Sequence, residues 1–176
     1  IQKYATIDWS GLKELIDYMD GVTVPLTAEE IAYYGWEDSK QPGMNLLTGK
    51  EARRHVANRS LAQDDWGRSR RQRDLLQAIF EKVTTEYSLG ELTDFVRYAA
   101  GVVKTNISFE MALSYATAVY RHRSDIRLEA GALPYPGTYT EGWYQHSDGW
   151  LAVVKTDFAG NRARLEKELY GSEGET

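Results

Sequence analysis

Residues 64–83 read DDWGRSRRQRDLLQAIFEKV and decide much of how this chain folds. Apolar residues recur here at helical spacing, which predicts the longest helix of the chain over about 66–87, with Asp65 as its N-cap. A helical wheel centred on Ile79 places the apolar residues on one stripe, formed by Leu75, Leu76, Ile79 and Val83.

Polar residues continue this stripe toward the start of the helix. Arg68 and Gln72 each fall about 20° from the centre of the stripe, and Arg71 lies about 80° away, at its edge. Arg70 points to the opposite side, and Arg73 lies about 120° off. Because a buried arginine without an anionic partner is costly, Arg68 needs an anion to meet it.

The start of a helix also offers free amide groups and a partial positive charge, and both favour anions. Arginine binds phosphate through two parallel hydrogen bonds, which lysine cannot do. Arg59, in the preceding loop, can fold back toward the same place. The pattern therefore predicts a phosphate-binding site made of Arg59, Arg68 and Gln72, with Arg71 behind them.

Two alternatives stay open from the spacing alone. Arg68 could form a structural salt bridge with Asp64, Asp65 or a distant glutamate. The segment 67–73 (GRSRRQR) could instead be a solvated basic face or a nucleic-acid patch, although its arginines do not share one outward face.

The composition is that of a globular protein. The chain has 176 residues, 42% of them hydrophobic, a net charge of −5 and no cysteine. These values predict one domain over 1–170 with a flexible tail at 171–176, and they exclude disulfides and thiolate chemistry. The negative charge argues against a nucleic-acid partner. No apolar run reaches the ~18 residues that span a bilayer. The chain begins at Ile1 without a Met, so the sequence leaves open whether a membrane anchor lies upstream.

Caps and turn residues outline the remaining elements. Helices are predicted at 10–20 (capped by Ser10), 28–34, 48–57, 88–102, 108–122 and 157–169, and strands at 4–9, 22–26, 126–133 and 151–155. Residues 35–45 are predicted to be a loop, and residues 134–149 to be turns with a hairpin. This order favours an α/β fold, a three-layer α/β/α sandwich with a mixed central sheet.

Other candidate sites are weaker. His55, His122 and His146 lack metal-ligand spacing, and Asp8 is a lone acid at a strand end. The aromatic residues of 135–150, like Gly35 and Trp36, could line an apolar pocket or serve as packing.

Several segments resemble the LytR–CpsA–Psr family of cell-envelope proteins. Residues 1–22 are similar to the strand–helix motif of that family, and residues 44–60 to a segment that ends in R-x-R-S. Residues 64–83 carry the family hallmark GRxxRQ, and residues 103–108 and 132–144 are similar to its C-terminal half. The resemblance covers nearly the whole chain.

This resemblance implies a fold and an activity. Members of the family transfer phosphate-linked glycopolymers, such as teichoic acids and capsular or wall polysaccharides, from a polyprenyl-pyrophosphate carrier to peptidoglycan. They lie on the extracellular face of the cell membrane, in the cell wall, held by an N-terminal membrane anchor. They have a mixed sheet flanked by helices, an apolar lipid pocket and an assisting Mg²⁺. By resemblance, Arg59 and Arg68 are catalytic, and together with Arg71 and Gln72 they bind the pyrophosphate.

The sequence departs from the family pattern at two points. Ala57 stands where the first arginine of R-x-R is expected. The first strands of the family, with the Mg²⁺-binding aspartates, lie outside this chain, so no metal ligand is predicted within it. A non-catalytic binder of polyprenyl phosphate or wall polymer is therefore one alternative, and a cell-envelope-related transcriptional attenuator is another.

Overall fold

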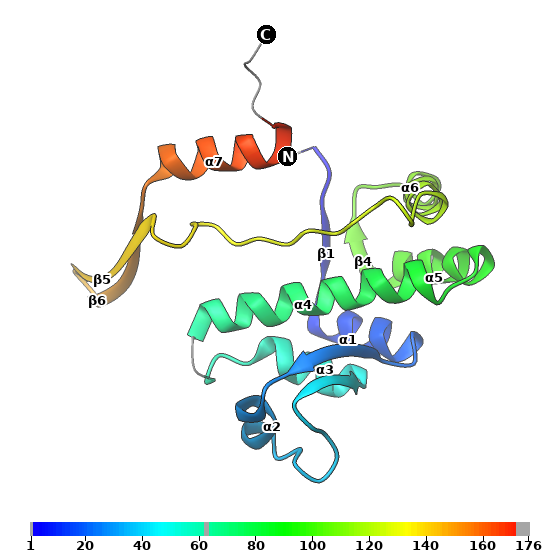
Figure 1. Ribbon diagram of the computed structural model, residues 1–176, viewed down its shortest axis with the longest axis horizontal. Coiled ribbons are helices and arrows are strands. Elements are labelled where there is room, and N and C mark those ends of the chain that lie inside the picture. The colour runs from blue at the N-terminus through cyan, green and yellow to red at the C-terminus, as the bar shows by residue number, and fades with distance from the viewer. Residues whose placement is uncertain (1, 62–63, 172–176) are drawn as a thin grey trace. The chain divides into compact units, whose positions relative to one another are not determined.

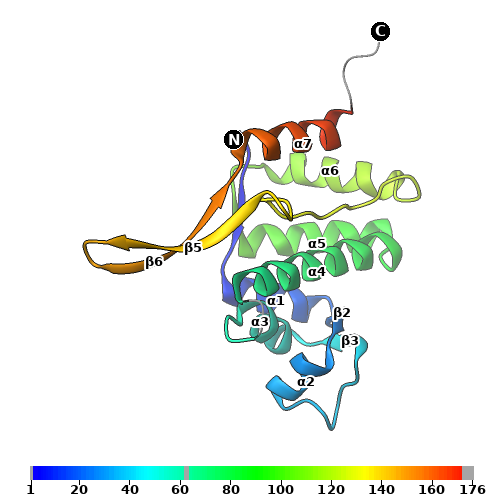
Figure 2. The same ribbon diagram turned by 60° about the vertical axis from the view of Figure 1, so that its left-hand side comes forward.

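The computed structural model describes residues 2–61 and 64–171, without the side chains of residues 64 and 65 (Figures 1 and 2). The chain divides between Ala130 and Gly131 into two compact units, each of which is described by itself. The extent of the predicted domain, 1–170, stays a prediction. In the described part of the chain, no helix combines the length and the apolar character needed to cross a membrane.

The first unit alternates short strands with helices and then becomes helical. Its elements are β1 (Ala5–Ile7), α1 (Trp9–Tyr18), β2 (Val22–Leu26), α2 (Ala28–Tyr34), β3 (Gly43–Leu47), α3 (Gly49–Ala57), α4 (Asp64–Thr85), α5 (Leu89–Val102), β4 (Val103–Thr105) and α6 (Phe109–Arg121). The second unit contains β5 (Tyr139–His146), β6 (Gly149–Thr156) and α7 (Phe158–Tyr170). The predicted α/β class is confirmed.

The strands pair in antiparallel fashion. Within the described residues they form three two-stranded sheets, β1 with β4, β2 with β3, and β5 with β6. In the second of these, Val22 pairs with Leu47 and Leu26 with Gly43. The hairpin of β5 and β6 confirms the turn-and-strand pattern predicted after residue 134.

Local capping signals place most helix starts where the sequence predicts them. Thr27, Thr48 and Ser88 each form a complete capping box with the glutamate three residues later. Each box satisfies two amide groups that the first helical turn leaves free. Helices α2, α3 and α5 therefore begin at the predicted positions.

Four predictions of local structure were wrong. The N-cap of α1 is Asp8 rather than Ser10, because Asp8 Oδ1 accepts hydrogen bonds from the amides of Ser10 (3.0 Å) and Gly11 (2.8 Å). The strand predicted at 4–9 is confined to β1, and residues 126–133 form no strand. The structure adds β3, which begins inside the predicted loop, and β4. Both owe their strand geometry to a partner distant in sequence, which local propensity does not reveal.

The core of the first unit lies among α1, α3, α4 and the β2–β3 pair. Its fully buried members are Ile16, Val22, Val24, Leu47 and Ala52. Helix α4 contributes Leu75 and Ala78 to this core. The face of α4 that packs inward thus continues through Arg71, which brings a charged residue into the interior.

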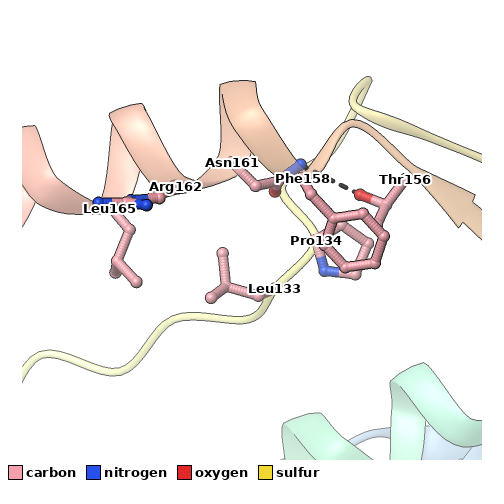
Figure 3. A pocket seen from close by; sticks show the side chains of 7 residues that line it. All are labelled: Leu133, Pro134, Thr156, Phe158, Asn161, Arg162 and Leu165. Carbon is pink, nitrogen blue, oxygen red and sulfur yellow. Dashed lines mark hydrogen bonds between the residues drawn. The ribbon is translucent and has the colours of Figure 1, made fainter.

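Asn161 connects the start of α7 to the hairpin in the second unit. Its side-chain amide donates to Thr138 Oγ1 (2.8 Å) and Thr156 Oγ1 (3.1 Å), and its oxygen accepts from the amide of Tyr135 (2.7 Å). Beside it lies a largely apolar pocket of about 390 Å³ (Figure 3). The pocket is lined by Leu133, Pro134, Thr156, Phe158, Asn161, Arg162 and Leu165.

Candidate functional site

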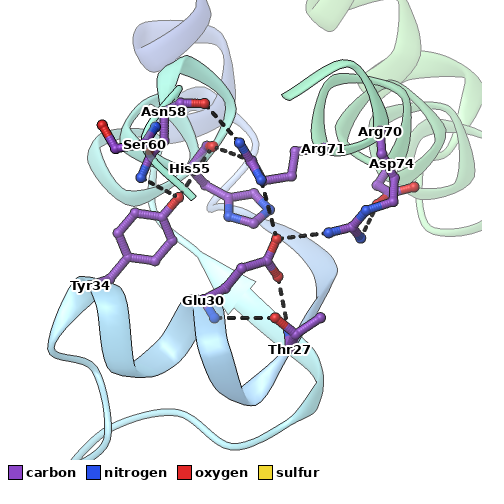
Figure 4. A network of polar contacts seen from close by, with 9 residues as sticks. All are labelled: Thr27, Glu30, Tyr34, His55, Asn58, Ser60, Arg70, Arg71 and Asp74. Atoms are coloured by element: carbon purple, nitrogen blue, oxygen red, sulfur yellow. Dashed lines mark hydrogen bonds and ion pairs between the residues drawn. The ribbon is translucent and has the colours of Figure 1, made fainter. Parts of the chain in front are cut away.

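Arg71 is the centre of a buried polar network that joins three helices (Figure 4). Its side chain is 1% exposed. Nε donates to the backbone carbonyl oxygen of His55 at 3.0 Å, and Nη2 donates to that of Asn58 at 2.7 Å. Nη1 lies 3.6 Å from Oε1 of Glu30. The guanidinium therefore ties α4 to the last turn of α3 and to α2.

Glu30 is the anion of this network. Its Oε1 lies 2.8 Å from Nη2 of Arg70, and its Oε2 accepts the amide of Thr27 at 2.9 Å in the capping box. Burial alone would raise the pKa of Glu30, but the Thr27 amide and the surrounding positive charge outweigh it and lower the pKa. One carboxylate thus caps α2 and compensates two arginines of α4.

His55 lies beside the same carboxylate and is 1% exposed. Neither of its ring nitrogens has a hydrogen-bond partner among the described residues. Burial lowers the pKa of His55 to about 4, although Glu30 opposes the shift. The Tyr34 ring packs edge-on against the imidazole, with 5.9 Å between ring centroids. His55 is therefore neutral at pH 7.

The network corrects the helix faces predicted for Arg70 and Arg71. Arg71 lies at the centre of the buried face rather than at its edge, and Arg70 turns toward Glu30 rather than away. Leu76, predicted to be buried, is 61% exposed. The helical wheel was centred on apolar residues alone, so it did not place Arg71 on the buried face. The cost of burying Arg71 is offset by Glu30 and two carbonyl oxygens.

Gln72 and Arg68 lie one turn apart on α4 and are both half-buried. Nε2 of Gln72 donates to the carbonyl oxygen of Val56 at 3.3 Å. Arg59 follows Val56 by three residues and is exposed. These contacts hold the loop that carries Arg59 against the helix that carries Arg68 and Gln72.

Of the four predicted site residues, Arg71 is fully buried, whereas the other three are half-buried or exposed. Its hydrogen-bonding capacity is directed to protein groups, which gives it a structural role in this arrangement. The helix starts at Asp64, so its free amides belong to the turn that precedes Arg68.

The structure also bears on the two alternatives for the arginine segment. The segment is not a continuous solvated face, because Arg71 is buried and Arg70 pairs with Glu30 and Asp74. A salt bridge of Arg68 with Asp64 or Asp65 involves side chains outside the described ones, as does the capping role predicted for Asp65. The buried glutamate that meets this helix, Glu30, pairs with Arg70 and Arg71.

Sequence reasoning missed Glu30, His55 and Asn58 as members of the network. The only local signal was the position of Glu30, three residues after Thr27, which indicates a cap but no ion pair. Of the aromatic residues of 135–150, Tyr135 is buried and serves as packing, whereas Trp143 is 71% and Trp150 is 64% exposed. Asp8 caps α1.

The described residues also offer no ligand set for Mg²⁺. Across 2–61 and 66–171, no three histidine, aspartate or glutamate side chains come together as a metal site would require.

Comparison with known proteins identifies relatives of this chain. The chain is 26% identical to the polyisoprenyl-teichoic acid–peptidoglycan teichoic acid transferase TagV of Bacillus subtilis over 119 residues, which are 65% of this chain and 30% of TagV. It is 28% identical to the regulatory protein MsrR of Staphylococcus aureus over 116 residues, 64% of this chain and 36% of MsrR. The chain thus spans about a third of the length of these relatives.

Solved structures share the fold. The crystal structure of B. subtilis TagV superposes with a TM-score of 0.68 at 21% identity, covering 96% of this chain and 63% of that one. Protein gbs0355 of Streptococcus agalactiae superposes with a TM-score of 0.71 at 21% identity, covering 100% and 60%. The model of the LytR_cpsA_psr family matches residues 1–157, and the chain therefore belongs to the LytR_cpsA_psr family.

Proposed function

We propose that this chain is part of a phosphotransferase that moves a phosphate-linked glycopolymer from a polyprenyl-pyrophosphate carrier to peptidoglycan. One observation carries the proposal: Gln72 and Arg71 fasten the end of α3 to α4, so that the loop of Arg59 lies against the helix of Arg68. Family membership and the name of TagV, a teichoic acid transferase, support it.

In this proposal Arg59, Arg68 and Gln72 bind the pyrophosphate of the carrier. A hydroxyl of peptidoglycan attacks the phosphorus that bears the glycopolymer. A new P–O bond forms, the bridging P–O bond of the pyrophosphate breaks, and polyprenyl phosphate leaves. The hydroxyl proton passes to solvent or to a base outside this chain.

The two arginines would neutralise charge that builds up on the phosphoryl oxygens and on the leaving phosphate. Catalysis of this kind depends on positioning and electrostatic stabilisation. A charged hydrogen bond contributes about 1.5–3 kcal/mol. Mg²⁺ as cofactor, a membrane anchor and a site of action on the extracellular face of the membrane are part of the same proposal.

A transfer assay with a labelled lipid-linked glycopolymer, using the complete protein, tests the proposal. Arg68→Ala should reduce transfer and binding of the carrier at least ten-fold, as expected for one lost charged hydrogen bond. Arg70→Ala is the matched control on the same helix, because Arg70 pairs with Glu30 and Asp74 rather than with the proposed site. Equal losses in the two folded variants would refute the assignment of the site.

A second candidate is a non-catalytic binder of polyprenyl phosphate or wall polymer. Ala57 favours it, because this position lacks the first arginine of the family's R-x-R pattern. Carrier binding without any transfer by the complete protein would establish the binder and exclude the enzyme. Ala57→Arg should then strengthen binding of the carrier.

A further inference from the structure

A basic hollow lies along α3 and borders the Arg71 network at Asn58. Its volume is about 660 Å³. It is lined by Lys13 of α1, Tyr33 of α2, and Lys50, Arg53, Arg54, Ala57 and Asn58 at α3. The lining holds four cations and no carboxylate, in a protein whose net charge is −5.

The cations of α3 form a single stripe. Arg53 and Arg54 follow Lys50 by three and four residues, and Ala57 follows them by four and three, so all four share one face. The cations themselves extend about 6 Å along the helix axis, from Lys50 to Arg54, and the stripe continues on the same face to Ala57. It ends at Ala57, two residues before Arg59 of the proposed pyrophosphate site.

Among the described residues, three of these four cations have no carboxylate paired with them. Lys13 pairs with Asp17 at 2.8 Å, and the amide of Gly49 also binds that carboxylate. Within the described part of the chain, no carboxylate lies within salt-bridge distance of Lys50, Arg53 or Arg54. Arg54 is held in place instead, donating to the carbonyl oxygen of Tyr34 at 3.1 Å and stacking over the ring of Tyr34 at 4.9 Å.

This arrangement is unfavourable for the isolated helix. Like charges three and four residues apart repel each other. Lys50 also lies in the first turn, where the helix dipole disfavours a cation. A bound polyanion would relieve both effects, which makes the stripe better suited to a ligand than to solvent.

We propose that the hollow binds the phosphodiester-linked sugar chain of an anionic glycopolymer. Phosphates spaced along such a chain match cations spaced along a helix face, and the exposed ring of Tyr33 can pack against a sugar. The inference rests on the proposed function, because it places the polymer beyond the pyrophosphate at Arg59. Nucleic acid fits less well, since Tyr33 is the one aromatic side chain lining the described hollow, which leaves a single surface for base stacking.

The test measures how a fluorescent oligosaccharide, whose sugars are joined by phosphodiesters, binds to the full chain at two salt concentrations. Lys50→Gln combined with Arg53→Gln should weaken binding on the order of ten-fold and reduce its salt dependence. Lys104→Gln combined with Arg121→Gln is the matched control, because it removes the same charge from exposed positions on β4 and α6. The control should bind as the unaltered chain does.

Three results would overturn the proposal: unchanged binding by the Lys50/Arg53 variant, equal weakening by the control, or neutral dextran or a DNA duplex bound as tightly as the polyanion. Farnesyl pyrophosphate separates this proposal from the proposed function. Its binding should be lost in Arg59→Ala and Arg68→Ala but kept in the Lys50/Arg53 variant. If the unaltered chain does not bind farnesyl pyrophosphate, the proposed pyrophosphate site is refuted. The polymer-binding proposal is then judged by the polymer-binding measurements alone.

Discussion

The Nε of Arg71 donates to the backbone carbonyl oxygen of His55 at 3.0 Å, which fastens the arginine-rich helix α4 to the end of α3. The same guanidinium reaches Asn58, the residue before Arg59. The most buried arginine of the family hallmark thus holds in position the loop that bears an arginine of the proposed site. Several expected outcomes follow from this and related contacts.

Arg71→Met should lower the free energy of unfolding by about 2–4 kcal/mol. It removes the donor to the carbonyl oxygen of Asn58 and leaves that of His55 with the Tyr34 hydroxyl at 3.4 Å, and a buried polar group that loses its partner costs about 1–3 kcal/mol. Urea denaturation followed by circular dichroism measures the change. Arg73→Met is the control, since among the described residues Arg73 bonds within its own helix, to Ser69 at 2.9 Å, and should cost less than about 1 kcal/mol. A similar loss in both variants would contradict the buried role of Arg71.

Stability should fall as the pH falls from 6.5 toward 4. In this window the unfolded chain binds a proton at His55, whose ordinary pKa is 6.5, while the folded chain, with a pKa of about 4, does not. The unfolded state binds more protons there, so the free energy of unfolding decreases with falling pH, by about 3 kcal/mol over the window.

His55→Phe should flatten this part of the profile, because the ring no longer titrates. Glu30 also makes the free energy of unfolding depend on pH, but over a lower pH range. Its pKa is lowered on folding, so its stabilisation is present above its ordinary pKa of 4.5 and is lost as the pH falls further. Denaturation midpoints across pH 3–7 separate the two. An unchanged slope between pH 6.5 and 4.5 in the variant would exclude His55 as its source.

Gly49→Ala should destabilise the packing of α1 against α3. A methyl group at Gly49 would lie 2.1 Å from the carbonyl oxygen of Lys13 and 2.7 Å from Oδ1 of Asp17. Backbone would have to move, and overpacking of this kind costs about 1–3 kcal/mol. Gly90→Ala is the matched control, because its methyl group would have no neighbour closer than Ser88 Oγ at 3.9 Å. It should gain up to about 1 kcal/mol from helix propensity, as a thermal melt would show.

Asn161→Ala should loosen the second unit. It removes the acceptor of the buried Tyr135 amide and the donor that joins Thr138 to Thr156. The expected loss of local stability is about 2 kcal/mol, seen as faster amide hydrogen exchange in β5, β6 and α7. Arg162→Ala, at an exposed neighbouring position, should leave exchange unchanged. Equal amide exchange rates in the two variants would show that Asn161 does not stabilise the second unit.

Helix boundaries were predictable where their determinants are local. The pairs Thr48–Glu51 and Ser88–Glu91 mark helix starts because cap and partner lie three residues apart. Strands β3 and β4 were not predictable, because their geometry comes from pairing with β2 and β1. Residues 126–133, predicted as a strand, contain Glu129, Ala130, Gly131 and Ala132, which are poor strand formers, and they form no strand in the structure.

The sequence by itself determined the helices, the capping boxes of α2, α3 and α5, the α/β class and the motif by which the chain resembles its family. It also indicated that the arginines near the start of α4 need anions. Only the tertiary structure decided which arginine is buried. Arg70 and Arg71 turn toward Glu30, which lies 40 residues from Arg70 along the chain. Helical periodicity describes the neighbours of a residue within its own helix, whereas the energy of a buried charge depends on the partner that the fold brings to it.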